Sequence, residues 1–215
     1  MLPVSDSTPP AAEARVRPYS DAPRLPEGAV VDPRKLVESN GRPVELELGP
    51  GRGGFVFERL AHDPDVTLIG LEIRRKWATI VDKKLVTLGL GRRARVFAED
   101  GKHALPRFPA ASVSAVFVHF PDPWWKKRHT KRLLLGDALL EELVRVLVPG
   151  GQIFVQSDVE ERIDRYQELL DSHVALEPFG STPRVGENPF GARSPREHRA
   201  ISDGLPIYRL HYRRR

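Results

Sequence analysis

The stretch HFPDPWWKKRHTKRL, at residues 119–133, places three kinds of chemical group side by side. Asp122 supplies a carboxylate between two prolines that stiffen the turn, and Trp124 and Trp125 supply flat aromatic rings. Aromatic rings can stack on bases, and cations can contact phosphates. Either tryptophan could instead pack in the core, and a basic run could be a solvated helix start. Helix starts favour acids, however, so this cluster suggests an anionic partner. The basic residues are Lys126, Lys127, Arg128, Lys131 and Arg132.

Acidic residues recur at the ends of the strands that the sequence predicts. The carboxyl ends of parallel strands lie at one edge of a sheet, and this edge is where ligands bind. Polar loops in general would explain one or two such acids, but five in succession favour a binding site. The five are Glu47, Glu72, Asp100, Asp122 and Asp158.

A glycine-rich loop, ELELGPGRGGF, joins the first strand to a helix. Gly49 and Gly51 permit a tight turn and a close approach of the backbone to a ligand. The spacing Gly49-x-Gly51-x-x-Gly54 suits a dinucleotide, and Gly49-x-Gly51-x-Gly53 suits S-adenosylmethionine equally well. A third alternative is an ordinary turn without a ligand.

Two acids favour S-adenosylmethionine over NAD. Glu47 lies inside the strand before the glycines, where a carboxylate would attract the ammonium of a methionine moiety and repel a pyrophosphate. Glu72 follows Gly51 by 21 residues, as expected for an acid that binds ribose hydroxyls, and this spacing suits either cofactor. Asp100 ends the third strand, where it would meet an adenine amino group. The chain also leaves no room for a separate oxidoreductase substrate domain.

The elements that position these residues alternate between strands and helices. That alternation predicts an α/β fold with a mostly parallel, seven-stranded sheet and helices on both faces. The two late strands are joined by a loop rich in proline, glycine and arginine. We expect strands at 44–49, 66–73, 93–100, 112–120, 152–158, 174–181 and 206–213, and helices at 54–63, 74–90, 133–147 and 159–173.

The composition excludes some kinds of site and indicates the location and domain organisation of the protein. The chain has 215 residues, 40% of them hydrophobic, a net charge of +5 and no cysteine, which excludes disulfides and Cys-ligated zinc. It shows neither a membrane span nor a signal peptide, so we expect a cytoplasmic protein without a metal site. Seven prolines in residues 1–33 predict a disordered extension, followed by one domain over residues 34–215.

From about residue 44 onward the chain resembles the bacterial tRNA (guanine-N7)-methyltransferases, a family of class I, Rossmann-like methyltransferases. The motif FPDPWWKKRHTKR is the most specific, and ELG, LIGLEI, QSD and RSPREH…DGLPIYRL also match. The resemblance implies methyl transfer from S-adenosylmethionine to N7 of a guanosine in the tRNA variable loop, guanosine 46. It implies tRNA as the partner, with no membrane and no obligatory protein partner, and a monomer or homodimer.

The resemblance also assigns roles to residues. Asp122 would serve catalysis and the cofactor site together. The implied cofactor residues are Glu47, Gly49, Gly51, Glu72, Asp100 and Asp122; the substrate residues are Lys126, Asp158, Ser194, Pro195, Arg196 and Glu197; the RNA contacts are Arg128, His129, Lys131 and Arg132.

Three positions depart from the family pattern. Ser194 replaces a threonine but keeps the hydroxyl, Leu133 replaces a common arginine, and Trp125 lies in a variable spacer. Two rival functions remain open at this point. One is a methyltransferase that acts on a small molecule or protein, which the basic run disfavours. The other is an RNA-binding protein without catalysis, which the intact acids disfavour.

Overall fold

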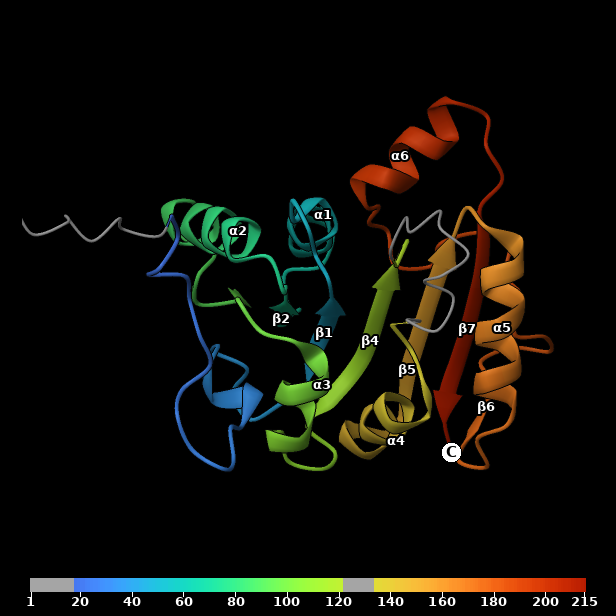
Figure 1. Cartoon of the computed structure of the whole chain (residues 1–215), viewed down its shortest axis with the longest axis horizontal. Coiled ribbons are helices and arrows are strands. Elements are labelled where there is room, and N and C mark those ends of the chain that lie inside the picture. Colours follow the sequence, from blue (N-terminus) through green and yellow to red (C-terminus); the bar gives the residue numbers. More distant parts are fainter. Residues whose placement is uncertain (1–17, 122–133) are drawn as a thin grey trace, which may run out of the picture.

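The computed structural model describes residues 18–121 and 134–215, which are organised around a seven-stranded sheet (Figure 1). The strand order is β3-β2-β1-β4-β5-β7-β6. Strands β1 to β5 pair in parallel, whereas β7 runs antiparallel to both β5 and β6. The mostly parallel α/β sheet predicted from the sequence is thus confirmed. The strands are β1 (Val44–Leu48), β2 (Leu68–Leu71), β3 (Ala94–Phe97), β4 (Val113–His119), β5 (Leu147–Ser157), β6 (Leu176–Pro178) and β7 (Tyr208–Arg214).

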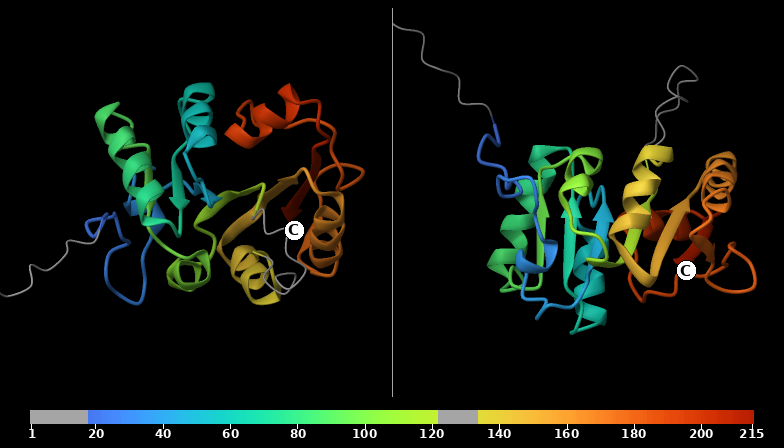
Figure 2. Two further views of the ribbon diagram at one scale, coloured as in Figure 1. Left: turned by 45° about the horizontal axis from the view of Figure 1, so that its top comes forward. Right: turned by 90° about the horizontal axis from the view of Figure 1, so that it is seen from below.

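Helices cover both faces of the sheet (Figure 2). Alternate residues of each strand point to opposite faces, so the apolar side chains form two separate clusters, one on each face. One cluster joins the sheet to α1 and α2, and the other joins it to α3, α4 and α5. In the parts of the chain that are described, no helix has the length and apolar character needed to cross a bilayer. The helices are α1 (Gly54–His62), α2 (Arg75–Thr87), α3 (Gly101–Ala104), α4 (Asp137–Val146), α5 (Glu160–Asp171) and α6 (Pro195–Ser202), with short 3-10 turns η1 (Pro33–Lys35) and η2 (Leu105–Arg107).

Helix α6 lies in the segment that the sequence suggested was an irregular loop. Ser194 caps the helix by accepting a hydrogen bond from the Glu197 N–H, and Pro195 occupies the first turn. Figure 1 shows α6 beyond the end of the sheet to which the β4 and β5 arrowheads point. The late segment therefore reaches the edge at which ligands are expected.

Residues 18–33 pack against the domain, which corrects the expected disordered extension for this part of the chain. Ala22, Leu25 and Val31 are buried, and the Val31 N–H donates to the Arg107 carbonyl (2.8 Å). Proline-rich composition argues against a core of the segment's own, but these scattered apolar side chains enter the core of the neighbouring domain. Residues 1–17 lie outside the described ranges.

Candidate active site at the carboxyl edge of the sheet

The predicted acids follow one another along the sheet in the order of the strands. Asp100 lies after β3, Glu72 after β2, Glu47 near the end of β1, and Asp158 after β5. Since neighbouring strands lie roughly 4.8 Å apart, four strand intervals span roughly 19 Å. An extended ligand that lies across this edge can therefore meet the acids of neighbouring strands in turn.

The glycine loop turns tightly through residues in the left-handed conformation. Gly49 has φ of +74° and Gly51 has φ of +54°, values that favour glycine. The Gly51 N–H donates to Glu72 Oε2 (2.9 Å), and the Arg74 N–H donates to the other oxygen, Oε1 (2.8 Å). Glu72 thus fixes the loop while its carboxylate keeps further acceptor capacity for a ligand.

The four glycines of this loop serve two different purposes. A Cβ at Gly49 would meet nothing within 4 Å, so the space beside this residue is open. A Cβ at Gly53 would lie 2.6 Å from the Val81 side chain, and one at Gly54 would lie 2.5 Å from Pro195. Gly54 is therefore explained by close packing against α6, and its spacing from Gly49 is no argument for a dinucleotide.

Asp100 begins α3, where its Oδ1 accepts a hydrogen bond from the Lys102 N–H (2.9 Å). The turn that carries it is held by the N-terminal segment. The Ala98 N–H donates to the Pro23 carbonyl (2.6 Å), and Arg24 pairs with Glu99 (2.8 Å). Residues outside the expected domain boundary therefore help to position a predicted cofactor residue.

Glu47 is buried, with 2% of its surface exposed, and His119 is its direct partner. His119 Nδ1 lies 2.9 Å from Glu47 Oε1. Glu47 Oε2 and His119 Nε2 are both buried and have no hydrogen-bond partner among residues 18–121 and 134–215. His119 was not predicted as a site residue. Its position at the end of β4, directly before the Phe-Pro-Asp motif, was the available signal.

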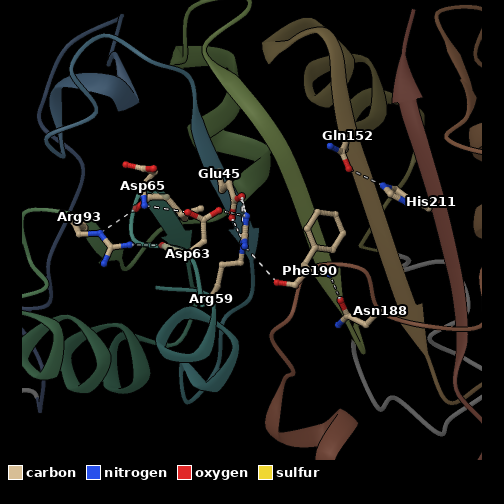
Figure 3. Close-up of polar contacts among 10 residues, drawn as sticks. Glu45, Arg59, Asp63, Asp65, Arg93, Gln152, Asn188, Phe190 and His211 are labelled. Atoms are coloured by element: carbon tan, nitrogen blue, oxygen red, sulfur yellow. Dashed lines mark hydrogen bonds and ion pairs between the residues drawn. The ribbon is translucent and has the colours of Figure 1, made fainter. Parts of the chain in front are cut away.

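A second carboxylate on the same face of β1 is fully paired, which makes Glu47 exceptional. Glu45 is two residues earlier, and both its oxygens accept from Arg59, the shortest at 2.7 Å (Figure 3). Arg59 also donates to the Phe190 carbonyl (3.3 Å). Burial raises the pKa of Glu45, while Arg59 acts to lower it. The Glu45–Arg59 pair therefore holds α1 to the sheet, whereas Glu47 retains an unsatisfied oxygen.

The structure brings together the predicted substrate residues Asp158 and Arg196, which form an ion pair with Arg196 Nε 3.1 Å from Asp158 Oδ2. Glu197 behaves differently, because it is completely buried. Its carboxylate accepts hydrogen bonds from Arg209 (2.9 Å), Gln156 (2.8 Å) and Asn188 (3.1 Å). Glu197 thus anchors α6 to β5 and β7, and its direct contact with a substrate stays a prediction.

The central motif lies partly outside the described residues. The backbone that leads to it is described up to Pro121, whose carbonyl accepts a hydrogen bond from Arg162. Phe120 has φ of +46°, a strained conformation for a bulky residue, and its N–H donates to the Gln156 carbonyl (2.8 Å). The predicted site residues outside the description are Asp122, Lys126, Arg128, His129, Lys131 and Arg132.

The side chains at this edge suit a cofactor that carries an adenosine and an amino acid. Asp100 and Glu72 offer acceptors for an adenine amino group and ribose hydroxyls, and Ile73 exposes apolar surface directly beside Glu72. Glu47 offers an unpaired carboxylate oxygen to an ammonium group. These donor and acceptor types match S-adenosylmethionine, and a carboxylate in place of an anion-binding group disfavours a pyrophosphate.

Comparisons with known proteins agree with this geometry. A family model described as "putative methyltransferase" matches residues 41–210. The tRNA (guanine-N(7)-)-methyltransferase of Myxococcus xanthus is 36% identical over 78% of this chain and 81% of its own length. The enzyme of the same name from Anaeromyxobacter dehalogenans is 38% identical over 82% of this chain and 87% of its own.

A solved structure supports the fold alone. The tRNA (m1A58) methyltransferase TrmI from Aquifex aeolicus has a TM-score of 0.52 at 18% identity, over 85% of this chain and 67% of that one. The architecture of the sheet, the spacing of the site residues and the similarity over most of the sequence all indicate the same family. The chain therefore belongs to the bacterial tRNA (guanine-N(7)-)-methyltransferase family, whose fold is the Rossmann-like fold of class I methyltransferases.

Proposed function

We propose that the protein transfers a methyl group from S-adenosylmethionine to N7 of guanosine 46 in the variable loop of tRNA. The observation that carries this proposal is the order of acidic groups along the sheet edge, Asp100, Glu72, Glu47 and then the β4 end. This order corresponds to adenine, ribose and methionine, so the reacting methyl group would come to lie beside β4. The relatives' names supply the guanine N7 acceptor.

When bound, S-adenosylmethionine would supply an electrophilic methyl group on a sulfonium. Guanine N7 carries an in-plane lone pair, so no residue has to remove a proton before it attacks. The protein's task is to align N7 with the methyl carbon and the sulfur. Glu47 would hold the ammonium and Glu72 the ribose, while the Asp158–Arg196 pair would border the acceptor side.

Asp122 is the residue to which we assign the developing charge. Positive charge moves to the purine during transfer, and a nearby carboxylate would stabilise it. Asp122 could also accept hydrogen bonds from guanine N1–H and the N2 amino group, and so select guanine over adenine. The described backbone that leads to Asp122 is strained at Phe120 and anchored at Pro121.

Cations at the same edge support an RNA acceptor. Arg52, Arg74, Arg75 and Lys76 are exposed near the starts of α1 and α2. Arg74 and its neighbours occupy the amino-terminal turn of α2, where the helix dipole disfavours cations. A polyanion that binds across this edge would offset that cost. We further propose that the protein acts in the cytoplasm without an obligatory protein partner, as a monomer or homodimer.

The experiment uses labelled S-adenosylmethionine, unmodified tRNA and identification of the product nucleosides. Label in 7-methylguanosine, reduced at least a hundredfold in Asp122→Ala, is the expected result if this carboxylate supplies electrostatic stabilisation. Label in another nucleoside would leave the cofactor assignment standing and overturn the acceptor. Full activity and guanine preference in Asp122→Asn would overturn the role of Asp122.

A further inference from the structure

The pair formed by Glu47 and His119 is incompletely satisfied on both sides. Glu47 has one bonded oxygen, at 2.9 Å from His119 Nδ1, and one buried oxygen without a partner in the part of the chain that the structure describes. His119 is also buried, and no described residue bonds its Nε2 atom. A buried carboxylate with an unpaired oxygen costs free energy unless a ligand compensates it. The pair therefore suggests a site prepared for a cationic group.

The choice of histidine at this position has a physical reason that the neighbouring Glu45 makes clear. Arg59 uses two nitrogens to bond both oxygens of Glu45 and brings a full positive charge. An arginine beside Glu47 would occupy both oxygens in the same way and neutralise the carboxylate. An imidazole that donates from Nδ1 makes one hydrogen bond to one oxygen and leaves the other oxygen able to accept from a ligand.

Aromatic rings hold the imidazole in place. The His119 ring lies 4.2 Å from the Phe55 ring, 5.8 Å from Phe117 and 6.2 Å from Phe154, measured between centroids. These apolar rings pack around the side chain, and the Glu47 carboxylate beside Nδ1 can only accept a hydrogen bond when it is ionised, so we assign a hydrogen to Nδ1. The donor aimed at Glu47 is therefore fixed before any ligand binds.

We propose that His119 is a positioning residue for cofactor binding: its Nδ1–H fixes the Glu47 carboxylate so that the free oxygen receives the ammonium of the methionine moiety. This inference rests on the proposed function, because it presumes that the ligand is S-adenosylmethionine. It goes beyond that function by assigning the specificity for the amino-acid end of the cofactor to a residue of β4 as well as to Glu47.

The test compares the affinity of the full-length protein for S-adenosylmethionine and for 5′-methylthioadenosine, which lacks the amino-acid end, by titration calorimetry. His119→Phe removes the donor and keeps an aromatic ring in the cage. We expect it to weaken S-adenosylmethionine binding about tenfold or more, the usual effect of losing a hydrogen bond to a charged group. Binding of 5′-methylthioadenosine should stay unchanged.

Two conservative variants sharpen the result. The amide nitrogen of Asn lies close to the position of histidine Nδ1, so His119→Asn should restore most of the affinity. The amide of Gln extends toward the position of Nε2, so His119→Gln should not restore it. A purely structural role for His119 would produce no such difference between the two amides.

His211→Phe is the matched control. His211 is buried in the same aromatic cluster, with its ring 5.8 Å from Phe154, and its Nε2 atom lies 2.8 Å from Gln152 Oε1 (Figure 3). We expect this variant to lose thermal stability but to bind both ligands like the wild type.

The outcomes distinguish a failure of the positioning role from a failure of the proposed function. If the wild type binds S-adenosylmethionine and folded His119→Phe binds it equally well, the positioning role is overturned and the proposed function stands. Equal losses for both ligands would also overturn the positioning role, since the effect would not depend on the ammonium. A wild type that binds 5′-methylthioadenosine no more weakly than S-adenosylmethionine would overturn it too. A wild type that binds neither ligand would overturn the proposed function and the inference together.

Discussion

At the scale of single residues, the contrast between Glu45 and Glu47 separates structural from functional burial. Both carboxylates lie on the same face of β1, and burial alone does not distinguish them. Their partners do, since Arg59 satisfies Glu45 and His119 satisfies only half of Glu47. A buried charge that its own protein leaves partly unpaired marks a ligand site more reliably than an acidic residue at a strand end.

The same substitution should affect cofactor binding at one glutamate and stability at the other. Glu47→Gln removes a poorly compensated charge, so we expect little loss of stability but at least tenfold weaker cofactor binding. Glu45→Gln removes the charge opposite Arg59 and leaves Asp63, at 3.4 Å, as the ionic partner of Arg59, so the free energy of unfolding should fall by about 2 kcal/mol. Urea denaturation and calorimetric titration measure the two effects. Equal destabilisation by both substitutions would contradict the distinction.

At the scale of elements, α6 packs against α1 on the side where we propose that the acceptor binds. Pro195 packs on Gly54, and Glu58 of α1 accepts hydrogen bonds from the Arg193 N–H (2.8 Å) and from His198 (2.6 Å). The buried Glu197 holds the same helix to β5 and β7. The position of Arg196 opposite Asp158 therefore depends on how closely the two helices approach.

A single added methyl group should disturb this contact. In Gly54→Ala the new Cβ would lie 2.5 Å from Pro195, closer than real contacts allow, so α6 must move away from α1. We expect kcat/KM for tRNA to fall about tenfold or more, because small displacements of a positioning group are costly. Cofactor affinity should change little.

Gly180→Ala provides the control for this prediction, since a Cβ there meets nothing within 4 Å and its φ is not in the left-handed range. Unchanged turnover in Gly54→Ala, with melting behaviour equal to that of Gly180→Ala, would show that the α1–α6 contact does not position the site.

The sequence predicted the elements better than their long-range contacts. The parallel strands and their acids followed from local patterns, because uniform apolar runs and glycine turns are local signals. Helix α6 was missed although Ser194, Pro195 and Glu197 form the start signal of a helix. The roles of His119 and Glu197 could not be read locally, since their partners lie 72 residues away for His119 and up to 41 away for Glu197.

At the scale of the whole molecule, the buried histidine His211 links stability to pH. Burial lowers the pKa of His211 to about 4 from an ordinary value of 6.5, so the folded state binds a proton less readily than the unfolded chain. The contribution of neutral His211 to the free energy of unfolding is complete above pH 6.5 and is lost as the pH falls from 6.5 toward 4.

Between pH 6.5 and 4 the free energy of unfolding should fall by up to about 1.4 kcal/mol per pH unit because of His211. In His211→Phe the stability at pH 7 should be lower, because Gln152 loses its partner, but its decline between pH 6.5 and 4 should be shallower. Urea unfolding at several pH values gives the slope of stability against pH for the wild type and for His211→Phe. Parallel slopes for the two proteins would contradict the assignment to His211.

The charge distribution should govern tRNA affinity across the same edge. We expect Arg75→Glu with Lys76→Glu to weaken tRNA binding and to reduce the salt slope of log K by about 0.7 to 0.9 for each phosphate that the variant no longer binds. Lys83→Glu with Lys84→Glu changes the net charge equally at the far end of α2, and should have a smaller effect. Equal effects of the two pairs would indicate non-specific attraction by net charge.

The central claim is that this edge of the sheet delivers a methyl group to N7 of one guanosine. The most direct measurement maps 7-methylguanosine along tRNA after reaction, by chemical cleavage of the chain at that nucleoside. We expect a single cleavage at guanosine 46, and none in the same tRNA with adenosine at this position. Cleavage at another guanosine, or methylation that persists when guanosine 46 is replaced, would contradict the account.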